Sequence, residues 1–179
     1  MLAVVAAGCV GPAGSDPPGC AEDDPFFVIA AQAVPSATLL PCVNVLPTGW
    51  RLESTLVERG SAEMWLESDR AGVGAVQIVL TRRCDTGDAV EVAPAPDEAG
   101  TRRFEEPVAL SPAYEANRYY VFDGGCVTYR FRFTSGAEPT LALEADEALS
   151  FTPRSVYVEQ VREDFGLTLC GAGAPACEG

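Results

Sequence analysis

The sequence contains neither histidine nor lysine. All 12 basic residues are arginine, and 26 acidic residues bring the formal net charge to -14. The lack of histidine excludes Ser–His–Asp and Cys–His nucleophile pairs and imidazole zinc sites. The lack of lysine excludes a Schiff-base lysine and a P-loop phosphate site. A sequence pI near 4.2 is not the electrostatic footprint of a nucleic-acid-binding protein, so we expect no nucleic acid as a partner.

Residue patterns along the chain predict an α+β fold. Asp24 and Pro25 are helix-start residues before the apolar run Phe26–Val34, and from Gly49 the hydrophobic period changes to two. Two aromatic-rich runs flank Asp123-Gly124-Gly125, which is typical of a hairpin. Helical spacing returns from Thr140. We therefore expect an antiparallel sheet of five or six strands, an N-terminal helix and two C-terminal helices, stapled by disulfides. Between Pro35 and Pro47 we expect irregular structure.

Seven cysteines divide into one near the N-terminus, Cys9, and an even set of six. Six cysteines permit 15 pairings, and an even set is typical of proteins outside the cytosol. Cys84 follows one predicted strand and Cys126 begins another, so we expect these two to pair. We further expect pairs Cys170–Cys177 and Cys20–Cys42, although pairing of Cys42 with Cys170 or Cys177 fits nearly as well.

The first nine residues, Met-Leu-Ala-Val-Val-Ala-Ala-Gly-Cys9, resemble the lipobox of bacterial lipoproteins. Leucine is usual where this chain has Ala6, and the basic start of a signal peptide is missing. The resemblance implies that Cys9 carries the lipid that anchors the protein to the outer face of the cell membrane. Residues 1–8 are then a truncated signal-peptide remnant, residues 9–20 a flexible Gly/Pro tether, and residues 21–179 a single α+β domain. The body is similar to uncharacterised envelope proteins of high-GC Gram-positive bacteria.

Half of the arginines occur in close pairs: Arg82 with Arg83, Arg102 with Arg103, and Arg130 with Arg132. The alternation of the predicted strand after Cys126 places Arg130 and Arg132 on its polar face. We interpret these two as candidate ligands for a small anion such as phosphate or a carboxylate. The alternative is pairing with carboxylates of neighbouring strands, such as Glu63 or Glu67.

These features favour a non-catalytic lipoprotein that binds a small anionic ligand or an envelope protein partner. No cofactor or metal is implied, because the sequence has no CxxC motif and no calcium-loop spacing. The alternative function is a carboxylate-dependent envelope hydrolase. That activity requires two convergent acids, one of them with a raised pKa.

Overall fold

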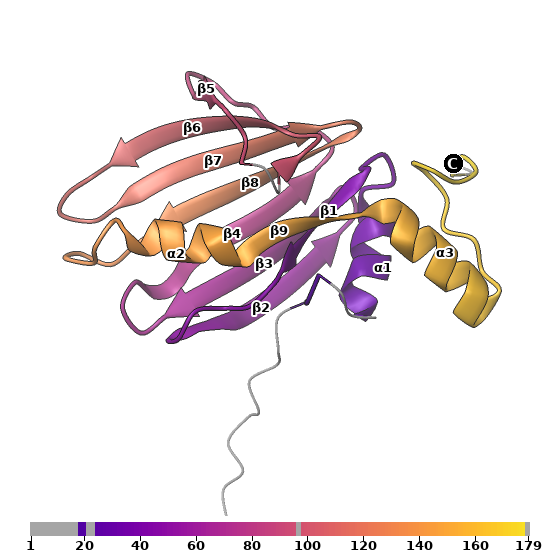
Figure 1. Ribbon diagram of the computed structural model, residues 1–179, viewed down its shortest axis with the longest axis horizontal. Helices are drawn as coiled ribbons and strands as arrows, with labels where there is room; N and C mark the ends of the chain where they lie inside the picture. The colour runs from indigo at the N-terminus through magenta and orange to yellow at the C-terminus, as the bar shows by residue number, and fades with distance from the viewer. Residues whose placement is uncertain (1–17, 21–23, 96–97, 178–179) are drawn as a thin grey trace, which may run out of the picture.

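A computed structural model describes residues 18–20, 24–95 and 98–177, which form an α+β fold (Figure 1). A seven-stranded antiparallel sheet has the order β2-β3-β4-β8-β7-β6-β5, and β1 and β9 form a separate pair. The elements are α1 (Pro25–Ala33), β1 (Leu39–Val43), β2 (Trp50–Glu58), β3 (Ser61–Ser68), β4 (Gly72–Thr81), β5 (Val90–Val92), β6 (Arg102–Ala109), β7 (Glu115–Phe122), β8 (Gly125–Arg132), α2 (Leu141–Ala148), β9 (Leu149–Pro153) and α3 (Arg154–Phe165).

The expected sheet of five or six strands was too small, because the large sheet has seven, and the separate β1–β9 pair was not expected at all. Leu39–Val43 lies in the segment expected to be irregular, yet it pairs antiparallel with Leu149–Pro153. Pro41 is tolerated there because a strand of a two-stranded ribbon has a free edge, where a missing N–H costs nothing. The N-terminal helix and the two C-terminal helices are confirmed.

One face of the large sheet carries the core. Along β8, Val127, Tyr129 and Phe131 are almost fully buried, whereas Arg130 and Arg132 on the other face are exposed. The pair β1–β9 and α2 lie across the buried face (Figure 1). The large sheet is therefore half-buried, as the alternation of polar and apolar residues predicts.

Local capping explains the helix positions. Asp24 accepts a hydrogen bond from the Phe26 amide at 2.7 Å, and Pro25 occupies the first helical position of α1. The helix α3 begins at Arg154, with Pro153 as its N-cap, and its C-cap is Gly166 in the left-handed conformation. No helix within the described residues has the length and hydrophobicity needed to cross a membrane.

Three disulfides join Cys20 to Cys42, Cys84 to Cys126, and Cys170 to Cys177. These are the pairs expected from the sequence. The pair Cys84–Cys126 staples neighbouring strands, because Thr81 at the end of β4 lies directly opposite Cys126 on β8. Disulfides therefore cross-link the core sheet, the start of the described chain and the C-terminal loop.

Candidate functional site

The two arginines predicted to bind an anion, Arg130 and Arg132, lie on the exposed outer face of the sheet and contact neighbouring side chains. Arg130 donates to Oε1 of Gln77 at 3.1 Å. Arg132 lies 3.5 Å from a carboxylate oxygen of Glu115 and donates to Asn117 at 3.3 Å. Their contacts run along the sheet surface, and the two are not gathered with the other arginine pairs.

The carboxylates weighed as their alternative partners are engaged elsewhere. Glu63 accepts from Gln77 at 2.7 Å, and Glu67 accepts from Arg51 at 2.6 Å. Arg130 therefore reaches Glu63 only through the Gln77 amide. The outer face is a surface network of cross-strand contacts.

A buried ion cluster that sequence reasoning missed lies between the sheet and α2. It consists of Glu98, Arg103, Glu105, Arg118 and Asp146. Arg103 approaches Glu98 at 3.1 Å, and Arg118 approaches Glu105 at 3.0 Å and also pairs with Asp146. The arginine side chains are only 14% and 8% exposed. The five residues come from the loop before β6, from the strands β6 and β7 and from the helix α2, so no local sequence pattern predicts the cluster.

The ion cluster joins α2 to the large sheet. Asp146 on α2 also accepts from the Tyr120 hydroxyl at 3.0 Å, and burial raises the pKa of Tyr120. Each carboxylate of the cluster faces a guanidinium, so the buried charges compensate one another. The cluster fixes α2 to the strands β6 and β7.

One end of the molecule gathers arginines that have no carboxylate partner within the described residues. Seven of the 12 arginines form ion pairs with carboxylates of described residues, and Arg130 contacts Gln77. The other four have no carboxylate partner within the described chain and belong to a single end of the sheet: Arg59, Arg82, Arg83 and Arg154. Charges left uncompensated in one place are candidates for binding a ligand of opposite charge.

The sheet topology brings these arginines together. Arg59 lies in the turn between β2 and β3, and Arg82 and Arg83 directly follow β4. Ser61 at the start of β3 is opposite Thr81 at the end of β4, so the turn and the strand end are neighbours. All three arginines are exposed.

Hydrogen bonds fix the loops that face these arginines. The Ser36 hydroxyl donates to the carbonyl of Gly124 at 2.6 Å, and the Ala172 amide donates to the carbonyl of Pro35 at 2.8 Å. Gly124 has φ +69°, and a Cβ there would lie 1.8 Å from the backbone carbonyl oxygen of Ser36. Only glycine permits this approach. The loop at Pro35–Ser36 is thereby held between the β7–β8 turn and the C-terminal loop.

Three adjoining cavities, of about 560, 830 and 400 Å³, follow this end of the molecule, and we call them together the arginine groove. The first two share Pro35 and Cys177, and the last two share Ser36, Arg82 and Gly124. Arg59 lines the first cavity, Arg82 the second and third, and Arg83 the third. The groove is elongated and has a guanidinium in every section.

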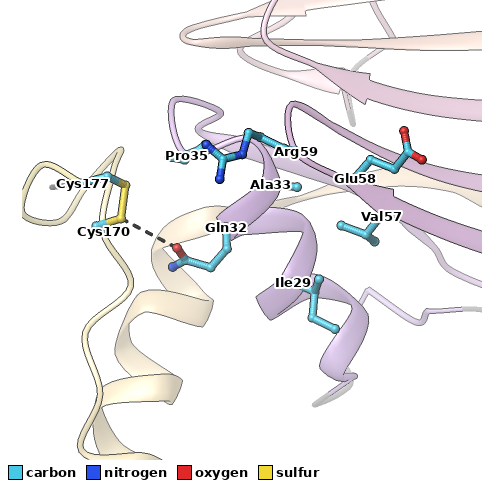
Figure 2. Close-up of a pocket in the computed structure, with 9 residues that line it drawn as sticks. All are labelled: Ile29, Gln32, Ala33, Pro35, Val57, Glu58, Arg59, Cys170 and Cys177. Carbon is cyan, nitrogen blue, oxygen red and sulfur yellow. Dashed lines mark hydrogen bonds between the residues drawn. A yellow bond between two sulfur atoms is a disulfide. The ribbon is translucent and has the colours of Figure 1, made fainter. Parts of the chain in front are cut away.

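Figure 2 shows the first cavity. Ile29 and Val57 make an apolar side, and Gln32 and the Cys170–Cys177 disulfide make the opposite side. The Arg59 side chain extends toward the disulfide side, whereas the Glu58 carboxylate points away from it (Figure 2). Glu58, which precedes Arg59 in the chain, therefore does not neutralise the Arg59 charge inside the cavity.

Arg154 lies beneath the groove and is 1% exposed. Its guanidinium donates to the carbonyls of Ala172 at 2.7 Å, Cys170 at 2.5 Å and Ala31 at 3.4 Å, and its Nε has no hydrogen-bond partner within the described chain. Burial lowers the pKa of Arg154, but an arginine remains charged at any physiological pH. A buried cation held by neutral carbonyls adds positive potential to the cavities that Cys170 and Ala172 line.

The groove lies at a different place on the sheet from Arg130 and Arg132, the pair predicted from the sequence to bind an anion. Arg82 and Arg83 carry a local signal similar to that of Arg130 and Arg132, namely two arginines close together in the sequence. Arg59 and Arg154 give no local signal, because each stands alone in the chain and joins the others only through the fold. Asp123 also lines the second cavity, so the groove is not purely basic.

No protein-family model, curated protein or solved structure matched the chain. Within the described residues, no group of His, Cys, Asp and Glu side chains is arranged to hold a metal ion. The predicted lipidation site, Cys9, lies outside the described residues, as do most of the tether and the signal-peptide remnant.

Proposed function

We propose that this protein is a non-catalytic, extracytoplasmic binding protein whose arginine groove binds an anionic ligand. The observation that carries the proposal is the segregation of charge. In a chain of net charge -14, three arginines without a carboxylate partner in the described residues, Arg59, Arg82 and Arg83, line one continuous groove. Guanidinium groups bind carboxylates and phosphates through forked, charge-assisted hydrogen bonds, so these are the expected ligand groups.

The shape of the groove favours an extended ligand over a single compact anion. Its charges are distributed over three sections, with Pro35 and Cys177 at the junction of the first two. An organic acid or phosphate ester with an apolar part fits the first cavity, where Ile29 and Val57 face Arg59. Overall negative charge repels anions at long range, so binding depends on short-range contacts in the groove.

We further propose a location at the outer face of the cell membrane, with Cys9 as the lipid anchor and residues 9–20 as the tether. Three disulfides support an oxidising compartment. Labelling with a radioactive fatty acid in a bacterial host is expected to mark the wild type and spare Cys9→Ser. Equal labelling of both proteins would remove this part of the proposal.

The alternative, a carboxylate-dependent hydrolase, has less support. The carboxylates that converge, Glu98, Glu105 and Asp146, are engaged with Arg103 and Arg118. Hydrogen bonds from Arg102 and Arg70 lower the pKa of Glu91 and Glu144, respectively. A general acid for glycoside hydrolysis needs a shift in the opposite direction.

Thermal unfolding in the presence of anions tests the binding proposal. Inorganic phosphate, citrate and a phosphate ester are each added to the full chain, against sodium chloride at equal ionic strength. An anion present at 100 times its Kd stabilises the folded state by about 2.7 kcal/mol. The expected result is a rise in Tm with at least one of these anions above the chloride control.

Matched variants locate the site. R82A/R83A and R59A are expected to lose the anion response, whereas R130A/R132A, an exposed pair on the outer face of the sheet, keeps it. Two results contradict the proposal: no response to any anion, or a response that R130A/R132A abolishes and R82A/R83A leaves intact.

A further inference from the structure

The three disulfides differ in how solvent reaches their sulfur atoms. Cys42 and Cys126 are each 0% exposed, so two of the bonds have one sulfur in the core. Cys20, Cys84 and Cys170 are partly exposed, and Cys84 lines the third cavity of the groove. Of the six bonded cysteines, Cys177 alone is exposed, and both cysteines of its bond line the first cavity. A thiolate must approach a disulfide sulfur to react with it, so access selects the Cys170–Cys177 bond.

The surroundings of this bond also favour cleavage. The Arg59 side chain extends toward the disulfide side of the first cavity (Figure 2). Arg154 donates to the carbonyl of Cys170 at 2.5 Å. The Arg59 charge on this side of the cavity and the Arg154 charge at the Cys170 carbonyl favour a thiolate at Cys170 as the leaving group in thiol–disulfide exchange.

We propose that Cys170–Cys177 is a redox-exchangeable site, reduced by a dithiol reductant of the extracytoplasmic space. The reductant's thiolate attacks the exposed Cys177 sulfur, the Cys170–Cys177 bond breaks, and Cys170 leaves as a thiolate. The reductant's second thiol then displaces Cys177 from the mixed disulfide. Two electrons pass from the dithiol, which becomes a disulfide, to the two cysteines, which take up protons and become thiols.

Reduction changes the floor of the groove. The disulfide closes the loop at 170–177, in which the Ala172 amide is bonded to Pro35 and the carbonyls of Cys170 and Ala172 hold Arg154. Opening this loop frees the chain that covers Arg154 and removes one wall of the first two cavities. The site thereby controls ligand binding, a consequence that rests on the proposed function.

Timed reduction of the folded full chain tests the site. Dithiothreitol is added without denaturant, samples are quenched with iodoacetamide, and alkylated peptides are measured by mass spectrometry. The expected result is alkylation of Cys170 and Cys177 at least roughly tenfold faster than of Cys84 and Cys126, because Cys84 is only partly exposed and Cys126 lies in the core. Simultaneous alkylation of all three pairs, or earlier alkylation of Cys20 and Cys42, would overturn the proposal.

Two variants make the test specific. R59A is expected to slow reduction of Cys170–Cys177, because it removes a charge that stabilises the leaving thiolate. The matched control R162A removes an exposed arginine that pairs with Glu159 on α3, and its reduction rate is expected to equal that of the wild type. Equal rates in R59A and wild type contradict the role of the Arg59 charge.

The consequence for binding has a separate readout. Selectively reduced and alkylated protein is expected to lose the anion-dependent rise in Tm, and C170S/C177S is expected to lack it as well. Selective reduction with an unchanged anion response contradicts the link to binding and leaves the redox site standing. Selective reduction in a protein that responds to no anion contradicts the proposed function alone.

Discussion

Removal of the Cys84–Cys126 disulfide tests whether it constrains the fold as its position in the sheet implies. The variant is C84A/C126A, which cuts a link across 42 residues of chain between neighbouring strands. In the chain-entropy account of disulfides, a loop of this size is worth about 4 kcal/mol of unfolding free energy at 25 °C. The same relation assigns about 3.5 kcal/mol to Cys20–Cys42, separated by 22 residues, and about 2.5 kcal/mol to Cys170–Cys177, separated by 7.

Urea unfolding followed by circular dichroism, without reductant, measures the three double alanine variants side by side. We expect the loss of stability to rank Cys84–Cys126 first, Cys20–Cys42 second and Cys170–Cys177 last. The denaturant slope is expected to rise most for C84A/C126A, because its unfolded chain is the most expanded. A loss below about 2 kcal/mol for C84A/C126A, or a larger loss for C170A/C177A, would refute the reasoning from loop size.

Three further predictions concern single residues and pH. Gly124→Ala is expected to destabilise the fold by at least about 1 kcal/mol, measured by urea unfolding, because the residue has φ +69° and its Cβ would meet the Ser36 carbonyl. Gly136→Ala is a comparison at positive φ with no atom within reach of the added Cβ, so a loss as large there would remove the argument from close approach. Tyr129→Phe is expected to leave stability at pH 7 unchanged or higher, because the buried hydroxyl has no hydrogen-bond partner in the described part of the chain; a loss above about 1 kcal/mol in urea unfolding would indicate a partner. Burial raises the pKa of Tyr129 and Tyr120, so the folded state keeps protons that the unfolded state loses, and Tm is expected to fall as pH rises above about 10, less steeply in Tyr129→Phe. An alkaline slope that Tyr129→Phe leaves unchanged would contradict this assignment.

The sequence alone determined the features that depend on neighbouring residues. Asp24 and Pro25 define the start of α1 because an N-cap and a fixed φ act within one turn of helix. Asp123 and Gly124 define the β7–β8 hairpin because glycine permits the positive φ that the turn needs. The period-two pattern of β8 determined which of its faces is buried, since a strand's side chains alternate between the two faces of its sheet.

Only the tertiary structure decided which distant segments meet. The β1–β9 pair joins residues about a hundred positions apart, and neither strand is recognisable locally: one contains Pro41, and the other follows a helix directly. The buried ion cluster depends on α2 lying over β6 and β7, which brings Asp146 to Arg118. No pattern of adjacent residues encodes such contacts.

The arginine groove shows the same division. Composition established that every cation is arginine and that acids outnumber arginines, so most arginines were expected to find carboxylate partners. Which arginines remain without one is a property of the fold. Arg59 lies in the β2–β3 turn, Arg82 follows β4 and Arg154 begins α3, and the fold brings all three to one end of the sheet. The carboxylates that pair with most of the other arginines lie elsewhere. Charge pairing acts over a few ångströms in space, and the sequence specifies that separation only through the folded chain.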